Sequence, residues 1–200
     1  MGLVIQYEEG QTPLDEDEKE GLLIQSITTR GELDETEQHN IENAIRWTLE
    51  RRKRFTTQEI LTEEFVRELH RRMLGNVWKW AGSFRNSDKN IGVDKYQIGI
   101  ELRMLIDDCI FWTKNNTYSG DEIAIRFKHR IVSIHCFANG NGRHSRLMGD
   151  IIVEKIFGLD VFTWGSKTRI QTGQLRAKYL AALHEADRGN YTLLLEFARS

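Results

Sequence analysis

The chain has 200 residues, 40% of them hydrophobic, which is enough for one domain with a buried core. Its 28 basic and 30 acidic side chains leave a formal net charge of -2, so no overall positive field would draw it to nucleic acid or to an anionic membrane. Two cysteines without zinc or disulfide spacing, no apolar run of roughly 20 residues, and an acidic N-terminus without a signal-peptide pattern predict a cytoplasmic protein.

Residues 1–33 are predicted to form an N-terminal arm, and residues 34–200 a single domain. The arm contains the only proline, Pro13, followed by the acidic stretch "LDEDEKEG", which has little apolar surface to bury. From Asp34 the pattern becomes helical, because Asp34 and Glu37 have the spacing of a capping box and apolar residues from Ile41 to Leu49 share one face. The basic run "RRKR" at 51–54 suits the end of this helix.

Further helices follow along the chain. Thr62 is expected to begin one that ends near Gly75, and helical spacing returns over residues 98–114. The spacing of Ser119 and Glu122 predicts another capping box, which begins a helix that runs into His135. One more helix is expected to end near Gly158, and a final pair to follow it, separated near Gly189.

The segment between residues 76 and 97 has a different composition. It is rich in Gly, Asn, Ser and Asp, with short apolar runs around Ile91 and Val93, and this predicts a long loop that contains a small hairpin. No strand pattern alternates with helices as a Rossmann or P-loop fold would require. The predicted fold class is therefore all-α with one small β-hairpin.

The stretch "IHCFANGNGRHSR" at 134–146 carries the most chemistry in the sequence. Gly140 and Gly142 allow positive φ and the close approach of a ligand to the backbone amides. These amides, together with the N-terminus of the helix that follows, predict a phosphate-binding site. Arg143 and Arg146 lie three residues apart, so both guanidinium groups share one helix face and could bind phosphoryl oxygens.

His135 is predicted to lie at the rim of this site, where an imidazole could act as general base for phosphoryl or nucleotidyl transfer. A histidine at a helix end is by itself an ordinary cap or core residue, and Gly-Asn-Gly is by itself an ordinary helix stop and restart. The combination of all these groups within one turn favours a functional site.

The same stretch resembles the signature of the Fic family, His-x-Phe-x-(Asp/Glu)-Gly-Asn-Gly-Arg-x-x-Arg, and matches every specified position except Asn139. "WKWAGSFR" is similar to the Fic region that leads to the target-binding flap, and "YLAALHEADRGNYTLLLEF" is similar to the C-terminal helices of the family. The resemblance covers roughly residues 35–198 and is strongest to the group called mobile mystery protein B. It implies a Fic-type helical bundle with a small β-hairpin flap.

The resemblance implies protein adenylylation, in which AMP moves from ATP to a hydroxyl group of a target protein. His135 would deprotonate that hydroxyl, and Phe137 would pack into the core and orient the histidine. Arg143 would bind the phosphates, and Arg146 would hold the terminal phosphate of ATP. The residues that would form the anion hole are Gly140, Asn141 and Gly142.

The resemblance also implies a flap and a metal site. Four residues, namely Asn90, Ile91, Gly92 and Val93, would bind the backbone of the target by adding a strand, a mode that fixes position with little side-chain specificity. The position that binds Mg²⁺ in the family is Asn139 here, and its amide oxygen could ligate a hard cation without contributing negative charge.

Two alternatives concern regulation and activity. Many Fic proteins carry an inhibitory helix with Ser/Thr-x-x-x-Glu-Gly/Asn, and "QHNIEN" at 38–43 is the nearest match, which makes Glu42 a candidate inhibitory residue; a solvent-facing glutamate is the other interpretation. Without an internal inhibitor, an antitoxin-like partner is expected. The alternatives to adenylylation are another transfer or AMP-removing activity, and a non-catalytic module that binds a nucleotide or a partner, which Asn139 favours.

Overall fold

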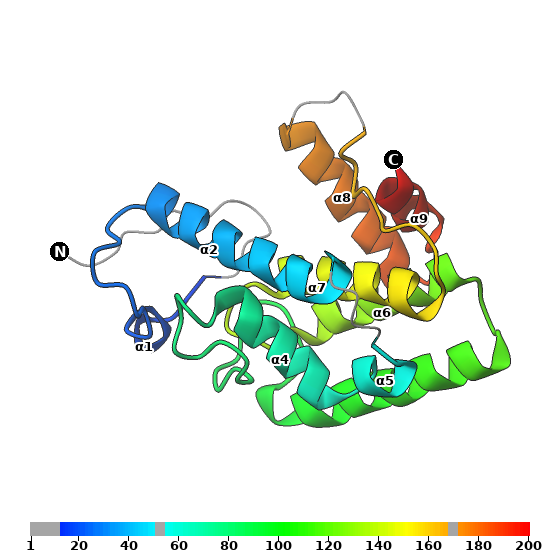
Figure 1. The fold of residues 1–200 in the computed structure, drawn as a ribbon, viewed down its shortest axis with the longest axis horizontal. Coiled ribbons are helices and arrows are strands. Elements are labelled where there is room, and N and C mark those ends of the chain that lie inside the picture. The colour runs from blue at the N-terminus through cyan, green and yellow to red at the C-terminus, as the bar shows by residue number, and fades with distance from the viewer. Residues whose placement is uncertain (1–12, 51–54, 168–171) are drawn as a thin grey trace.

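The computed structural model describes residues 13–50, 55–167 and 172–200 (Figure 1). The helical elements are α1 (Glu16–Lys19), α2 (Arg30–Ile45), the π-helical turn η1 (Arg46–Glu50), α3 (Thr57–Ile60), α4 (Glu63–Leu74), the 3-10 turn η2 (Lys95–Gln97), α5 (Ile98–Asn115), α6 (Gly120–Ile134), α7 (Asn141–Ile151), the π-helical turn η3 (Ile152–Ile156), α8 (Thr172–Asp187) and α9 (Thr192–Arg199). The predicted all-α class is confirmed. Over these described residues no helix has both the length and the apolar character needed to cross a membrane.

The small β-hairpin is not formed. Within the described ranges, β-type pairing is limited to an isolated antiparallel bridge between Leu22 and Trp78. The buried Arg85 donates hydrogen bonds to the carbonyl oxygens of Ser87 (2.9 Å) and Val93. The guanidinium group thus binds carbonyls that a hairpin would pair across strands, so the prediction of a hairpin was wrong while the loop itself was confirmed.

Helix α2 begins at Arg30, before the predicted cap at Asp34. Thr29 Oγ1 accepts a hydrogen bond from the Glu32 N–H (3.3 Å), and the Glu32 carboxylate accepts one from the Thr29 N–H (3.0 Å). This earlier capping box starts the helix, so the predicted cap at Asp34 was wrong and the expected boundary between arm and domain falls inside α2. The basic run at 51–54 lies outside the described residues.

Two other helix starts agree with the sequence. Thr62 Oγ1 accepts a hydrogen bond from the Phe65 N–H (3.1 Å) at the start of α4, which ends before Gly75. Ser119 Oγ accepts one from the Glu122 N–H (3.3 Å) at the start of α6. These local caps fix where both helices enter the core, and α6 ends where the sequence predicted, next to His135.

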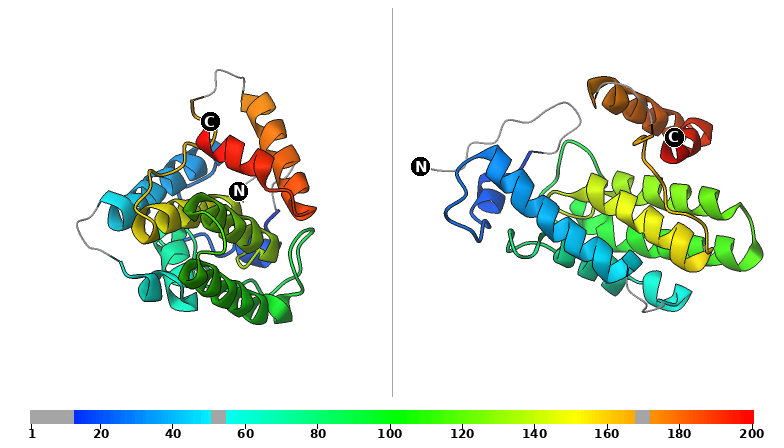
Figure 2. Two further views of the ribbon diagram at one scale, coloured as in Figure 1. Left: turned by 90° about the vertical axis from the view of Figure 1, so that its right-hand side faces the viewer. Right: turned by 45° about the horizontal axis from the view of Figure 1, so that its top comes forward.

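Helix α6 runs through the centre of the bundle (Figure 1) and packs against α5, α7 and α9. Helix α2 packs on α4, which in turn contacts α7, and α8 and α9 pair on one side of the bundle in all three views (Figures 1 and 2). The fully buried residues of α6 include Ile123 and Phe127. This packing places the turn at 135–140, which joins α6 to α7, among α2, α4 and α8.

Candidate active site

A cavity of about 830 Å³ lies at the junction of α2, α6, α7 and α8. The motif residues that line it are His135, Asn139, Gly140, Asn141, Gly142, Arg143 and Arg146. From the predicted flap, Ile91 and Gly92 line the same cavity, whereas Asn90 and Val93 are not among its lining residues. The structure therefore brings the whole motif and half of the predicted flap around one space.

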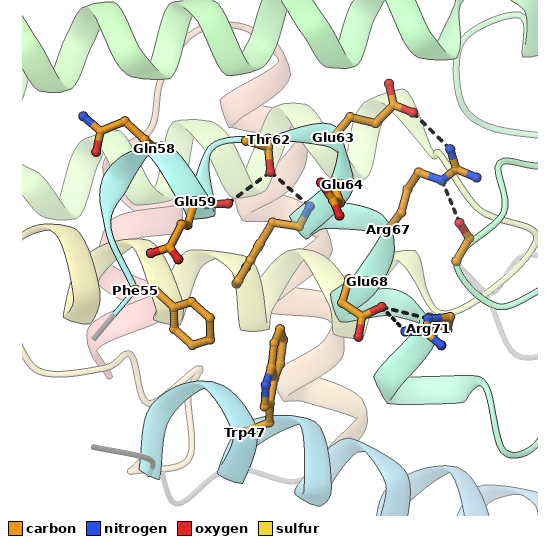
Figure 3. Close-up of a pocket in the computed structure, with 12 residues that line it drawn as sticks. Trp47, Phe55, Gln58, Glu59, Thr62, Glu63, Glu64, Arg67, Glu68 and Arg71 are labelled. Atoms are coloured by element: carbon orange, nitrogen blue, oxygen red, sulfur yellow. Dashed lines mark hydrogen bonds and ion pairs between the residues drawn. The ribbon is translucent and has the colours of Figure 1, made fainter. Parts of the chain in front are cut away.

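A second hollow, of about 1030 Å³, lies beside α4 and is also lined by Trp47 and Phe55 (Figure 3). Its lining includes four glutamates, Glu59, Glu63, Glu64 and Glu68. The guanidinium groups drawn there already pair with two of these carboxylates, Arg67 with Glu63 and Arg71 with Glu68 (Figure 3). An excess of carboxylates repels phosphate, so the cavity around the motif is the candidate site.

His135 ends α6 in a left-handed conformation, with φ 58° and ψ 61°. This conformation is uncommon for residues other than glycine, although histidine is among those enriched in it. Arg85 Nε donates a hydrogen bond to the His135 carbonyl oxygen (2.7 Å), and the His135 N–H donates to the Ile131 carbonyl oxygen (3.2 Å). These two contacts fix the backbone of His135 and turn the chain out of α6 into the motif.

The flap passes directly over His135. A Cβ atom added at Gly92, where φ is +109°, would lie 2.7 Å from the His135 Cβ, so only glycine fits at this point. The Val93 N–H donates a hydrogen bond to the Ile134 carbonyl oxygen (3.3 Å). As a result His135 is only 4% exposed, although its side chain lines the cavity.

Burial, together with the positive charges of Arg85 and Lys89, lowers the pKa of His135 to about 4, against a backbone hydrogen bond at Val132 that raises it. The imidazole is therefore neutral at pH 7. A neutral imidazole carries the lone pair that a general base requires. The structure thus keeps His135 ready to accept a proton.

The turn after His135 is held by side chains that face away from the cavity. Phe137 is fully buried and stacks on His70, with ring centroids 3.7 Å apart. His70 Nδ1 accepts a hydrogen bond from the Gly82 N–H (3.0 Å), so the neutral tautomer carries its proton on Nε2, which donates to the Asn139 carbonyl oxygen (3.0 Å). Burial, with the nearby His144, lowers the pKa of His70 well below its usual value and favours this neutral form.

Asn141 and Gly140 close the turn. The Asn141 side chain accepts a hydrogen bond from the Phe137 N–H (2.9 Å) and donates one to the Phe137 carbonyl oxygen (2.7 Å), so this side chain is structural. Gly140 has φ +77°, and a Cβ atom there would lie 2.6 Å from Leu74 Cδ1. Anion binding at these positions would therefore use the backbone N–H groups in the first turn of α7, where the helix dipole favours negative charge.

Asn139 lies beside this helix N-terminus. Its Oδ1 accepts a hydrogen bond from the Gly140 N–H (2.6 Å), which is the contact that a turn residue makes. Among the residues that the structure describes, no cluster of three or more His, Cys, Asp or Glu side chains could hold a metal. Any metal at this site would therefore depend on oxygen atoms from a ligand as well as from Asn139.

The two motif arginines line the same cavity but have different partners. Arg143 Nη1 pairs with Glu37 Oε2 at 2.7 Å. The Arg146 guanidinium lies 5.7 Å from the ring centroid of Tyr179 on α8, and its Nε donates a long hydrogen bond (3.4 Å) to the Gly142 carbonyl oxygen. Both guanidinium groups therefore line the same cavity as His135.

Glu37 was missed as a site residue by the sequence, which assigned it to a capping box. It lies on the buried face of α2 with Leu33, Asn40, Ile41 and Ala44, and a carboxylate on an apolar face was the available signal. Glu42, the candidate inhibitory residue, accepts a hydrogen bond from Gln38 Nε2 (3.2 Å) in an exposed position and is not among the cavity-lining residues.

The N-terminal arm holds the flap through buried charge. Lys89, whose side chain is 3% exposed, pairs with Asp15 (2.9 Å) and Glu18 (2.5 Å) of the arm. Ser87 Oγ donates a further hydrogen bond to Asp15 (2.7 Å), and the hydrogen bonds from Ser87 and Lys89 lower the pKa of Asp15. The arm therefore fixes the same loop that carries Gly92.

Replacing Lys89 by methionine is expected to speed amide hydrogen exchange in residues 90–93 by about tenfold, because the flap loses its ion pairs with the arm. Exchange followed by mass spectrometry measures this. Lys79→Met, at an exposed lysine, is the matched control. Equal exchange in Lys89→Met and wild type would contradict the role of the arm.

The chain is similar in sequence to known proteins. Residues 60–153 match the model of the Fic/DOC family. Protein adenylyltransferase fic-1 of Caenorhabditis elegans is 29% identical over 133 residues, which are 62% of this chain; the chain spans about a quarter (24%) of the length of that relative.

Solved structures agree in fold. Fic-1 (residues 134–508) from C. elegans has a TM-score of 0.63 and 23% identity, covering 90% of this chain and 50% of that chain. BepC from Bartonella tribocorum, solved with bound AMPPNP, has a TM-score of 0.63 and 16% identity. The match covers 92% of this chain and 97% of that chain. At these identities the structural likeness concerns the fold.

Proposed function

We propose that this chain, whose residues 60–153 match the model of the Fic/DOC family, is a protein adenylyltransferase that transfers AMP from ATP to a hydroxyl group of a target protein. The observation that carries the proposal is that a neutral His135, two arginines and a helix N-terminus line one cavity. A nucleotidyl transfer needs a base for the nucleophile and positive groups for the phosphates, and this cavity offers both. The curated relative is named an adenylyltransferase, which supports the same activity.

In this reaction the hydroxyl oxygen of the target attacks the α-phosphorus of ATP. The new O–P bond forms as the bond from the α-phosphorus to the bridging oxygen breaks, so pyrophosphate leaves. His135 accepts the hydroxyl proton, and Arg143, Arg146 and the N-terminus of α7 stabilise the charge on the phosphates. Because His135 starts neutral, the proton transfer turns it into a cation beside the negatively charged phosphates, which stabilises it.

Mg²⁺ would be held by Asn139, whose amide oxygen has a second lone pair beside the one used by Gly140. Mg²⁺ prefers oxygen ligands and retains several waters, so one amide oxygen with phosphate oxygens fits its chemistry, with less charge than a carboxylate would give. When bound, the ion would neutralise phosphate charge. An antitoxin-like partner and a cytoplasmic location stay predictions.

The decisive experiment incubates the protein with cell lysate and with ATP labelled at either the α- or the γ-phosphate. Transfer of the α-label alone supports adenylylation. Transfer of the γ-label would indicate phosphorylation, and binding of ATP without any transfer would indicate the non-catalytic module. Loss of label from a pre-adenylylated target would indicate AMP removal.

The Asn139 position gives a sharper test of the metal. Asn139→Asp is expected to lower the Mg²⁺ concentration for half-maximal transfer by several-fold, because a carboxylate adds the negative charge that the cation prefers. Asn139→Ala is expected to raise it or to remove activity. A Mg²⁺ titration of transfer for the three proteins measures this, and three coincident curves would leave Asn139 as the turn residue before Gly140.

A further inference from the structure

Glu37 has two partners far away in the sequence. Its Oε2 pairs with Arg143 Nη1 (2.7 Å), and its Oε1 accepts a hydrogen bond from Trp78 Nε1 (2.6 Å). The Glu37 side chain is 6% exposed, and Trp78 is almost fully buried. One carboxylate thus connects α2, the start of the flap loop and the first arginine of the motif.

The position of Glu37 relative to the cavity separates two possible roles. Arg143 lines the cavity and its side chain is 33% exposed, whereas Glu37 is not among the lining residues. The carboxylate therefore lies behind the guanidinium group, outside the space that phosphates would occupy. A guanidinium has five N–H donors in a planar fork, and the ion pair recorded here uses Nη1, which leaves donors on the cavity side for a ligand.

If Glu37 were an inhibitory residue, it would have to leave Arg143 when a nucleotide binds. Both of its oxygens are already engaged inside the protein, and a buried carboxylate that loses its cationic partner is strongly disfavoured. The Trp78 ring is itself fixed, since it stacks on Trp80 with centroids 5.1 Å apart. This arrangement suits a permanent support better than a movable inhibitor.

We infer that Glu37 is a positioning residue, which holds the Arg143 guanidinium in the orientation that binds the phosphates of the nucleotide. This inference rests on the proposed function, because it needs a phosphate ligand at Arg143. Arginine has a long and flexible side chain, and fixing it before the ligand arrives removes part of the ordering that binding would otherwise require. The support acts through Arg143, and Glu37 itself does not touch the ligand.

The test measures ATP binding by calorimetry and transfer kinetics for wild type and Glu37→Gln. Glutamine can still accept the hydrogen bond from Trp78 but loses the charge that holds Arg143. We expect about a tenfold weaker affinity and a correspondingly higher KM for ATP, with kcat little changed. Glu35→Gln, at an exposed glutamate of the same helix, is the matched control and should behave as wild type.

Coupling to Arg143 separates positioning from general structural support. In an Arg143→Ala background, Glu37→Gln should weaken ATP binding no further, because the side chain it orients is absent. An equal additional loss there would mean that Glu37 acts elsewhere and would overturn the inference. If Glu37→Gln fails to fold in a thermal melt, Trp78→Phe serves as a second variant. It removes the hydrogen bond that fixes the carboxylate, together with part of a buried ring, and a weaker affinity for ATP is expected in the folded protein.

The remaining outcomes are also decisive. Tighter ATP binding or faster transfer in Glu37→Gln would make Glu37 an inhibitor and overturn the inference, and unchanged affinity would do so as well. In both cases a wild type that binds and transfers from ATP leaves the proposed function intact. A wild type that binds no ATP would instead overturn the proposed function, and the inference with it.

Discussion

Replacing His135 by alanine is expected to lower the rate of AMP transfer by roughly 10²–10⁴-fold, which is the usual contribution of a positioned general base. ATP should bind about as well as in wild type, because the proposed phosphate contacts come from Arg143, Arg146 and the N-terminus of α7. Rates from labelled ATP, with affinity from calorimetry, measure the two effects separately. His39→Ala, at an exposed histidine of α2, is the control.

The pH profile adds an independent test of the same residue. Since burial lowers the pKa of His135 to about 4, the base is already deprotonated at neutral pH, and kcat/KM should stay level down to about pH 5 and fall near pH 4. The pKa of His135 is lower in the folded protein than in the unfolded chain, so the unfolded chain takes up a proton first as pH falls. The free energy of unfolding should therefore decrease as pH falls from 6.5 to about 4. A wild-type rate of AMP transfer in His135→Ala would show that His135 is not the general base.

The sequence predicted the parts of this protein that depend on neighbouring residues. The caps at Thr62 and Ser119 form between residues three apart, and α6 ends at His135 as its spacing predicted. The motif could be located for the same reason, because it fits within the turn between two helices. Local spacing is enough for such features.

The contacts that the sequence missed join segments far apart in the chain. Glu37 of α2 pairs with Arg143 of α7, and no local pattern encodes which arginine a buried carboxylate will meet. Two capping-box patterns lie close together in the sequence near the start of α2. Only the one at Thr29 forms, so Glu37 lies within the helix and is free to face the core. The prediction of a hairpin was wrong for a related reason. The Arg85 side chain donates hydrogen bonds to carbonyl groups of the loop that paired strands would have used.

Replacing Arg146 by alanine is expected to lower kcat/KM for ATP by about 10²–10³-fold, the cost typical of removing one donor that stabilises charge in a transition state. The structure places Arg146 in the cavity beside Tyr179, one helical turn beyond Arg143. If Arg146 holds the terminal phosphate, the variant should bind ATP much more weakly and ADP nearly as well as wild type. Arg143→Ala should weaken both, since it would bind phosphates that the two nucleotides share.

Arg146 also lies near Lys128. Burial and, to a smaller extent, the positive charge of Arg146 lower the pKa of Lys128 well below its usual value. Lys128 donates a hydrogen bond to the Tyr179 hydroxyl, so a change at position 146 could alter the packing of α8 rather than a phosphate contact. Arg146→Lys separates the two, because it keeps the positive charge beside Lys128 but loses the planar fork of donors. A phosphate role predicts that Arg146→Lys also loses its preference for ATP over ADP. Equal loss of ATP and ADP binding in Arg146→Ala, restored by lysine, would instead assign Arg146 to the support of α8.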